Sequence, residues 1–217
     1  MRLHSARPAP LSPWLLFMPS DPTITDVEPK RLEEAASAHT RPTSRARMTS
    51  AHGRPTAAFL MAHPAHFIAL GLGSGLAPKA PGTVGTLWGW LAYLVLAMWL
   101  TPAQLGWLIA ASIPVGWWAC TVTARNLNRP DPGHIVWDEI VAIWIVLWLA
   151  MPMGFWGQCI AFALFRFFDA VKPQPVKWAD QLFKGFGPQG GWGIMFDDLV
   201  AAFCTLLTIA LWRHFFF

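Results

Sequence analysis

The chain has 217 residues and a formal net charge of +4; 54% of its residues are hydrophobic and only 13% are charged. This composition excludes an ordinary soluble domain and is typical of a small polytopic membrane protein. The basic residues do not form runs interleaved with aromatic residues, so nucleic acid is not an expected partner. Contact with anionic lipid explains the positive charge better. The three cysteines lie in apolar runs without metal-ligand spacing and are expected to be buried thiols.

Residues 1–56 differ in composition from the rest of the chain. They hold eight of the sixteen Lys and Arg residues and five of the twelve acids, together with many Pro, Ser, Thr and Ala residues. Such a segment has too little apolar surface to fold by itself, so we predict a disordered N-terminal extension over residues 1–56. Residues 57–217 then form the membrane-embedded domain.

The segment from Thr56 to Gly71 is apolar but contains histidines and a proline, which favours a re-entrant or interfacial helix over a spanning one. The stretch from Gly71 to Thr86, GLGSGLAPKAPGTVGT, cannot be helical throughout, and Thr83 is expected to cap the next helix. Free backbone amides, Ser74, Lys79 and a helix N-terminus would suit a phosphate group. A simple turn between helices is an equally good interpretation of this spacing alone.

Five apolar helices follow, and the sequence predicts an all-α, polytopic bundle of these helices plus the N-terminal one. Their expected bounds are Thr83 to Leu100, Pro102 to about Ala124, Ile135 to Met151, Gly154 to Phe168 and Gly193 to Leu211. With these bounds, seven of the eight Lys and Arg residues after residue 56 fall on one side, and only Arg213 falls on the other. The positive-inside rule makes the first side cytoplasmic. The seven acids of residues 131–198 lie on or near the same side.

Two groups of charged residues belong to the ends of these helices. Asp138 and Glu139 fall in the first turn of the third apolar helix, where the helix dipole favours acids. Dipole compensation explains one carboxylate, whereas a cation site explains two. Arg166, Asp169 and Lys172 are spaced three residues apart and are expected to share one face of a helix end.

A third group lies inside the last apolar helix. Asp197 and Asp198 are costly there unless they are paired, hydrated or bound to a metal. Adjacent helical residues point about 100° apart, so only one acid of each pair is expected to face a given ion. Before this helix, Pro175 to Lys184 is expected to form a short surface helix in which Asp180 is a catalytic residue or part of a surface ion pair. Pro188 to Gly193, PQGGWG, is expected to be a flexible lead-in.

Clustered Asp and Glu residues without His or Cys partners favour hard cations that prefer oxygen ligands, Mg²⁺ first. Mg²⁺ held by a few carboxylates commonly bridges to a substrate phosphate, while Lys and Arg neutralise the remaining charge. Arg166, Lys172 and Lys79 are available for that task. The residues alone favour a phosphohydrolase or phosphotransferase that acts on a phosphorylated lipid. They leave open an ion-coupled channel or transporter and a non-catalytic membrane scaffold for lipid-synthesis enzymes.

Four blocks carry a resemblance to a known family: GSGLAPKAPGTVGT, IVWDEIV, FRFFDAVKPQPVKWAD and GGWGIMFDDLVAA. In their order and spacing they resemble the phosphatidylglycerophosphatase A family over roughly Phe67 to Leu211. The resemblance implies a multi-pass protein of the bacterial inner membrane. It also implies an Mg²⁺-dependent phosphatase that removes the terminal phosphate of phosphatidylglycerophosphate and gives phosphatidylglycerol.

The resemblance also implies the residues of the site. The positions that match the family's polar motifs are Asp138, Glu139, Asp169, Lys172, Asp197 and Asp198. The carboxylates among them are the expected Mg²⁺ ligands, and the expected contacts of the substrate phosphate are Lys79, Ser74, Thr83 and Arg166. Either a metal-activated water or one of the aspartates would attack the phosphorus, and both routes stay open. The sequence indicates no oligomeric state.

Overall fold

The structure is a computed structural model that describes residues 54–216. The regular elements of this part of the chain are helices. In chain order they are α3 (Ala57–Met61), α4 (Pro64–Ala69), the 3₁₀ helix η3 (Gly71–Leu76), α5 (Pro81–Trp99), α6 (Pro102–Leu127), α7 (Trp137–Ala150), α8 (Phe155–Val171), α9 (Val176–Leu182) and α10 (Pro188–Phe216). The predicted all-α class is confirmed. The predicted disordered extension lies, apart from its last three residues, outside the described range.

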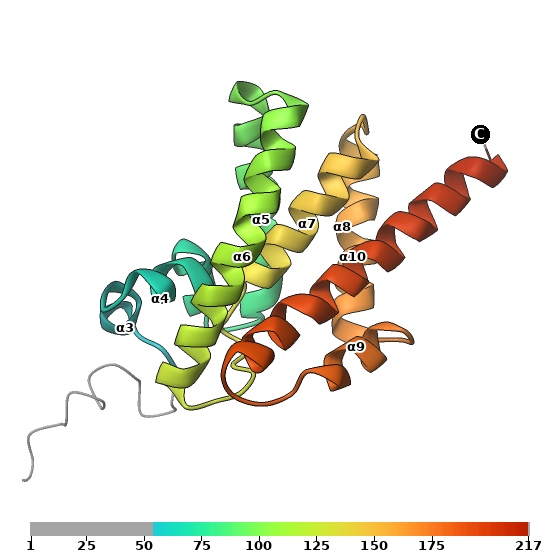
Figure 1. Ribbon diagram of the computed structural model, residues 1–217. Coiled ribbons are helices and arrows are strands. Elements are labelled where there is room, and N and C mark those ends of the chain that lie inside the picture. The colour runs from blue at the N-terminus through green and yellow to red at the C-terminus, as the bar shows by residue number, and fades with distance from the viewer. Residues whose placement is uncertain (1–53, 217) are drawn as a thin grey trace, which may run out of the picture. The chain divides into compact units, whose positions relative to one another are not determined.

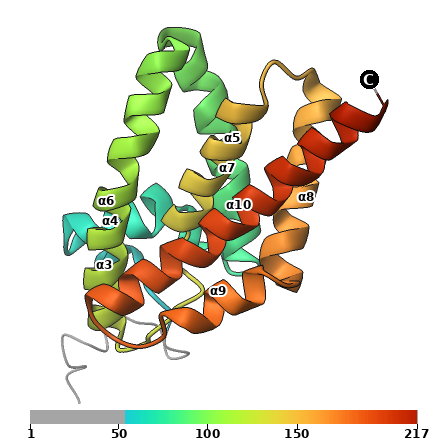
Figure 2. The ribbon, with the colours of Figure 1, turned by 45° about the vertical axis from the view of Figure 1, so that its right-hand side comes forward.

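Helix α7 lies at the centre of the bundle, and α5, α6, α8 and α10 pack around it (Figure 1, Figure 2). Its side chains form a nearly continuous apolar run, and a helix that is apolar on all sides is normally buried. Ile140, Val141 and Ile143 are accordingly at most 1% exposed. Asp138 and Glu139 lie in its first turn, as predicted. The central helix therefore carries two acids at one end of the core.

Three helices of the described part, α5, α6 and α10, are long and apolar enough to cross a membrane by length and composition. Helices α7 and α8 have 14 and 17 residues. At about 1.5 Å per residue, they fall short of a hydrocarbon core of roughly 30 Å. Of the five apolar helices expected, three are thus candidate spans. Large apolar side chains on α5 and α6 stay exposed, as on helices that face lipid, among them Leu91, Met98 and Trp107.

The N-terminal apolar segment forms two short helices rather than the single re-entrant or interfacial helix expected. Pro64 begins α4 and has no N–H with which to continue the hydrogen bonds of α3. His63 caps α4, because its Nδ1 accepts a hydrogen bond from the N–H of Ala65 at 3.1 Å. In η3, Leu72 and Gly73 have positive φ angles of 57° and 105°. The glycine-rich stretch is therefore not α-helical before residue 81, as predicted.

The first candidate span begins at Pro81, and the prediction that Thr83 caps it is wrong. The N-cap is Ala80, which has a φ of 46° and makes no capping side-chain hydrogen bond. Pro81 at the first helical position needs no partner for an N–H group and has a φ already suited to a helix. Thr83 lies within the first turn, and its side chain is exposed.

The prediction that Pro188–Gly193 is a flexible lead-in is also wrong. Helix α10 begins at Pro188, so these glycines lie inside its first turns. A Cβ atom on Gly190 would collide with the carbonyl of Gly185, and one on Gly191 would collide with Thr121 of α6. Glycine therefore serves close approach between backbones here rather than flexibility.

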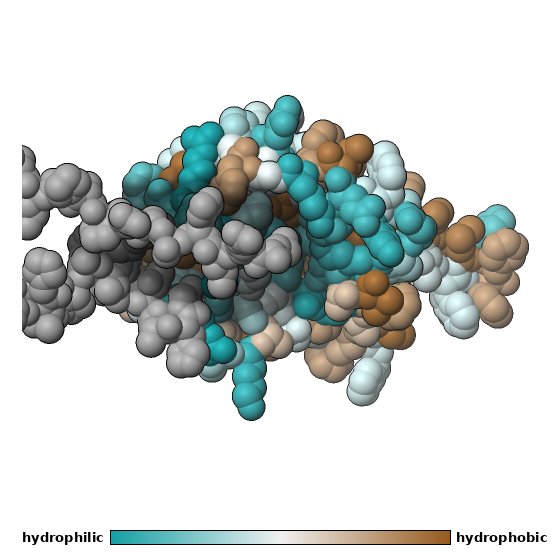
Figure 3. All heavy atoms as spheres, turned by 90° about the horizontal axis from the view of Figure 1, so that it is seen from below, coloured by the Kyte–Doolittle hydropathy of each residue, from teal (hydrophilic) through white to brown (hydrophobic). Residues whose placement is uncertain are grey.

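Several helix ends meet on one side of the bundle. Helix α8 ends at Val171 and is followed by Lys172 and two nearby prolines, as predicted. Helix α9, at the lower side of Figure 1, packs against α10. The starts of α5, α7 and α10 lie on the same side (Figure 2). Hydrophilic side chains gather on this side, which Figure 3 shows from below.

Candidate active site

A polar pocket of about 250 Å³ lies where the starts of α5, α7 and α10 meet the end of α8. The carboxylates that line it are Asp131, Asp138, Glu139, Asp169, Asp197 and Asp198. Two cations, Arg166 and Lys172, line it as well. Because the carboxylates outnumber the cations, a further cation bound in the pocket would stabilise their ionised forms.

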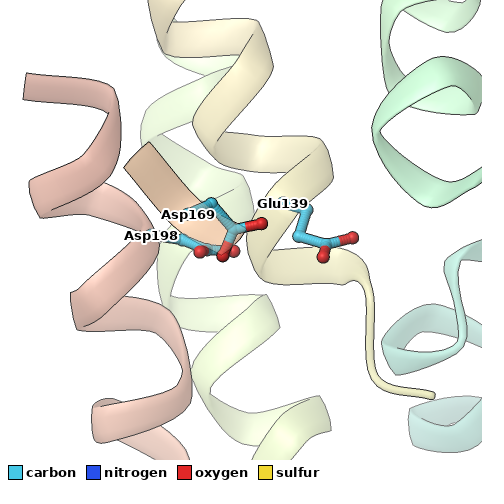
Figure 4. A group of neighbouring side chains, drawn as sticks. All are labelled: Glu139, Asp169 and Asp198. Atoms are coloured by element: carbon cyan, nitrogen blue, oxygen red, sulfur yellow. The ribbon is translucent and has the colours of Figure 1, made fainter. Parts of the chain in front are cut away.

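Three of these carboxylates converge from three helices (Figure 4): Glu139 of α7, Asp169 of α8 and Asp198 of α10. Each offers an oxygen atom, and these atoms all lie within 4.8 Å of one another. Among the described residues, Oε2 of Glu139 and Oδ2 of Asp198 are buried and have no hydrogen-bond partner. A buried carboxylate oxygen without a partner is costly in free energy. A bound cation would give both of these oxygens a partner. This carboxylate triad therefore fits a hard metal ion that prefers oxygen ligands.

In each of the two pairs of adjacent acids, Asp138–Glu139 and Asp197–Asp198, the two residues have different contacts. Glu139 and Asp198 belong to the carboxylate triad, whereas their neighbours do not. Oδ1 of Asp138 accepts a hydrogen bond from the N–H of Glu139 at 3.0 Å. Oδ2 of Asp197 lies 2.6 Å from Nζ of Lys172. The angle of about 100° between adjacent helical residues accounts for this division.

Arg166 joins two members of the carboxylate triad. Its Nη1 donates to Oε1 of Glu139 at 2.9 Å and also forms an ion pair with Asp169. A longer hydrogen bond, of 3.4 Å, reaches Oγ1 of Thr86 on α5. Charge-assisted hydrogen bonds of this kind hold carboxylates in fixed places. The guanidinium group thus orients two triad oxygens and compensates part of their charge.

Lys172 is the centre of a second group of ion pairs. Its Nζ lies 2.5 Å from Oδ1 of Asp180 and 2.6 Å from Oδ2 of Asp197. Lys184 reaches Oδ2 of Asp180 at 2.9 Å. Burial opposes the charge of Lys172, but the carboxylates of Asp197 and Asp180 outweigh it and raise the pKa of this ammonium group. Partial burial of Asp180 is likewise outweighed by hydrogen bonds from both lysines, which lower its pKa.

Three of the residues expected to contact phosphate, Ser74, Lys79 and Thr83, do not line this pocket. Oγ of Ser74 donates to a backbone carbonyl within η3 at 2.9 Å, and the other two side chains are exposed. The glycine-rich stretch instead contributes backbone at the start of α5. A Cβ atom on Gly82 would collide with the carboxylate of Glu139, so glycine at this wall of the pocket leaves room for that carboxylate in its present position.

Comparison with known proteins identifies the family. The model of the family "Phosphatidylglycerophosphatase A" matches residues 67–213. This chain belongs to the phosphatidylglycerophosphatase A family. The sequence is 38% identical over 147 residues to the phosphatidylglycerophosphatase A of Escherichia coli strain K12, which covers 65% of this chain and 78% of that protein. It is 38% identical over 148 residues to the Haemophilus influenzae phosphatidylglycerophosphatase A, with coverage of 68% and 87%.

A third relative has a different name. A Bacteroides thetaiotaomicron protein, provisionally named a phosphatidylinositol-3-phosphatase, is 37% identical over 152 residues, which cover 67% of this chain and 91% of that protein. No solved structure matches the chain. The family resemblance of the four sequence blocks is confirmed.

The pocket of this phosphatidylglycerophosphatase A family member contains residues that the sequence did not single out. Asp131 lines it from the loop between α6 and α7 and makes no ion pair or hydrogen bond among the described residues. The sequence marked it only as the first of seven acids on one side of the membrane.

A second pocket of about 250 Å³ shares Asp131, Ile194 and Asp197 with the first and is also lined by Asp180. Asp180 therefore lies beside the site and is not part of the first pocket's lining.

Proposed function

We infer that the chain is a phosphatidylglycerophosphatase that hydrolyses the terminal phosphate monoester of phosphatidylglycerophosphate and gives phosphatidylglycerol. Family membership supports the activity and the lipid substrate. The observation that carries the assignment of the site is the carboxylate triad, which has an arginine and a lysine beside it and two buried oxygens that lack hydrogen-bond partners within residues 54–216. Three candidate spans and the uneven distribution of Lys and Arg support a multi-pass protein of the bacterial inner membrane, with the site on the cytoplasmic side.

Mg²⁺ is the ion that we assign to the carboxylate triad, with Glu139, Asp169 and Asp198 as its ligands. Of the His, Cys, Asp and Glu side chains that the structure describes, three carboxylates converge there, and Mg²⁺ prefers such ligands and usually bridges to a substrate phosphate. When bound, Mg²⁺ supplies Lewis-acid polarisation of the phosphoryl group and neutralises part of its charge. Arg166 keeps two of the three ligands in place before substrate binds.

Arg166 and Lys172 are the groups that we assign to the phosphate oxygens. Among the described residues, all hydrogen bonds of the Arg166 side chain use Nη1, which leaves the Nη2 and Nε N–H groups to donate. A lysine ammonium group has three donors, and those of Lys172 contact two carboxylates. One donor remains for a phosphate oxygen. Both cations are already held by carboxylates, so they donate to the phosphate from fixed positions and little reorganisation is needed.

Asp138 is the residue that we assign as general base. It lines the pocket, is 9% exposed and lies outside the carboxylate triad. Its hydrogen bond to backbone uses Oδ1, which leaves Oδ2 to accept a proton from the attacking water. The helix start that carries it also holds Glu139, so the base and one metal ligand move together. Attack by an aspartate of the site is the alternative route.

Phosphate release from phosphatidylglycerophosphate by the purified protein in detergent tests this function. We expect release with Mg²⁺, none with EDTA, and a loss of several orders of magnitude in Glu139→Gln or Asp169→Asn protein that is still folded. A panel with phosphatidylinositol 3-phosphate and phosphatidic acid tests the choice of lipid. No release by folded protein would refute the function, and faster turnover of another lipid would refute the substrate.

A further inference from the structure

We propose that Asp180 of α9 is a positioning residue, which holds Lys172 in place for the phosphate group from outside the pocket. The proposal rests on the phosphatase function proposed above and adds to it a residue that acts through another. Its consequence is that a short surface helix determines where one cation of the site points.

The geometry places the ammonium group of Lys172 between two carboxylates on two different helices. Asp180 of α9 lies 2.5 Å away, and Asp197 of α10 lies 2.6 Å away. Lys172 itself follows the last residue of α8 with a φ of 46°, so its side chain leaves the end of a helix. A long, flexible side chain is fixed at such a place only by partners at its tip. With Asp180 absent, Asp197 alone would draw the ammonium group toward α10.

A simple surface ion pair does not explain this arrangement. The pair between Lys184 and Asp180 is of that kind, because the Lys184 side chain is 63% exposed. Exposed pairs contribute little to stability. The side chains of Asp180 and Lys172 are only 19% and 30% exposed, and Lys172 lines the pocket. Asp180 thus contacts both the exposed Lys184 and Lys172, which lines the pocket.

Helix α9 is held against α10 by apolar contacts that do not involve Asp180. Val176 and Ala179 are fully buried. The rings of Trp178 and Phe183 contact Phe196 of α10, with centroid distances of 6.4 Å and 5.5 Å. Because these contacts remain, Asp180→Asn should remove a charge without undocking α9.

The test is a double-mutant cycle on hydrolysis of phosphatidylglycerophosphate by the full-length protein. We expect Asp180→Asn to lower kcat by about 10- to 100-fold, the size of effect expected when a group of the site is displaced by about 1 Å. The loss should fall on kcat rather than KM, because the misplaced charge matters most in the transition state. In a Lys172→Met background, Asp180→Asn should cause no further loss. Asp180→Glu should recover part of the rate, and the matched control Lys184→Ala should leave it unchanged.

Additive losses in the cycle, equal losses for Asp180→Asn and Asp180→Glu, or a comparable loss in Lys184→Ala would overturn the proposal. A second readout does not depend on hydrolysis. In protein labelled with ¹⁵N-lysine, the ammonium signal of Lys172, assigned by its absence in Lys172→Met, should weaken in Asp180→Asn and persist in Lys184→Ala. An unchanged signal in Asp180→Asn would refute the positioning role. An inactive wild type with the expected signals would refute the proposed function alone.

Discussion

Replacing Asp198 by asparagine should stabilise the metal-free protein and greatly reduce its stabilisation by Mg²⁺. Asp198 is 3% exposed, and its Oδ2 has no hydrogen-bond partner among the described residues. One of its oxygens lies within 4.8 Å of oxygens of Glu139 and Asp169. In the absence of a cation these carboxylates repel one another, and Arg166 compensates only two of them directly. Asparagine keeps the shape of the side chain and removes one of the repelling charges.

The separation of the carboxylates sets the size of this effect. At 4.8 Å and an effective dielectric constant of about 20, two unit charges repel by about 3.5 kcal/mol. Asp198 takes part in two such pairs, and the nearby guanidinium group and proton uptake by the buried carboxylates offset much of the repulsion, so we expect a gain of at most about 2 kcal/mol in EDTA. For a chain of this size, this gain corresponds to a rise in Tm of about 4–8 °C. Mg²⁺ at about 100 times its Kd should stabilise the wild type by about 2.7 kcal/mol and the variant by much less.

Thermal unfolding of the detergent-solubilised protein in EDTA and in Mg²⁺ measures both effects. Asp131→Asn is the matched control, because Asp131 lines the same pocket but is exposed and lies outside the carboxylate triad. Its stability should change by about 0.5 kcal/mol or less. If Asp198→Asn lowered the Tm in EDTA and in Mg²⁺ alike, the carboxylate would be held by hydrogen bonds instead of by a cation, and the reasoning would be refuted.

Three further predictions concern other parts of the structure. Gly82→Ala should lower kcat at least tenfold in a phosphate-release assay, because its Cβ atom would displace Glu139, a proposed metal ligand. Gly133→Ala should not lower kcat, because a Cβ atom there meets nothing within 4 Å. Lys79→Ala should leave kcat and KM within about twofold of the wild type, since an exposed side chain outside the pocket stabilises no phosphate charge. Burial lowers the pKa of His66, whose Nε2 accepts a hydrogen bond from Asn126 at 2.8 Å. The folded protein favours the neutral form of His66, so the free energy of unfolding should decrease as the pH falls below about 6.5. Unfolding measured from about pH 7.5 to 5.5 tests this, and the decrease due to His66 should be absent in His66→Gln.

The helical class and the acidic ends of the helices were predictable because they depend on local patterns. The prolines after Lys172 end α8, and the acids Asp138 and Glu139 fall in the first turn of α7, as the sequence predicted. Apolar runs also gave the order of the helices. These features can be predicted from the backbone preferences of single residues and from the cost of exposing apolar surface to water. Both can be judged residue by residue from the sequence.

The membership of the carboxylate triad was not predictable, because it depends on how helices rotate about their axes. The sequence predicts that one acid of each adjacent pair faces an ion, but the packing of α7 and α10 decides that Glu139 and Asp198 are the ones that join the carboxylate triad. The start of α10 depends on contacts that only the folded chain makes, such as that of Gly191 with Thr121. Asp131 joins the pocket through a loop, whose path no periodic pattern describes.

The adjacent acids of α10 would connect the proposed metal site rigidly to the proposed phosphate site. Asp198 belongs to the carboxylate triad, while Asp197, one residue earlier on the same helix, holds Lys172. Helix α7 has the same arrangement, with Glu139 in the carboxylate triad and Asp138 beside it as the assigned base. A helix fixes the separation of neighbouring side chains, so the proposed metal ligands shift together with Asp197, which holds Lys172, and with Asp138, the assigned base. In the proposed site this accounts for the adjacent pairs of acids on α7 and α10, in each of which one residue belongs to the carboxylate triad.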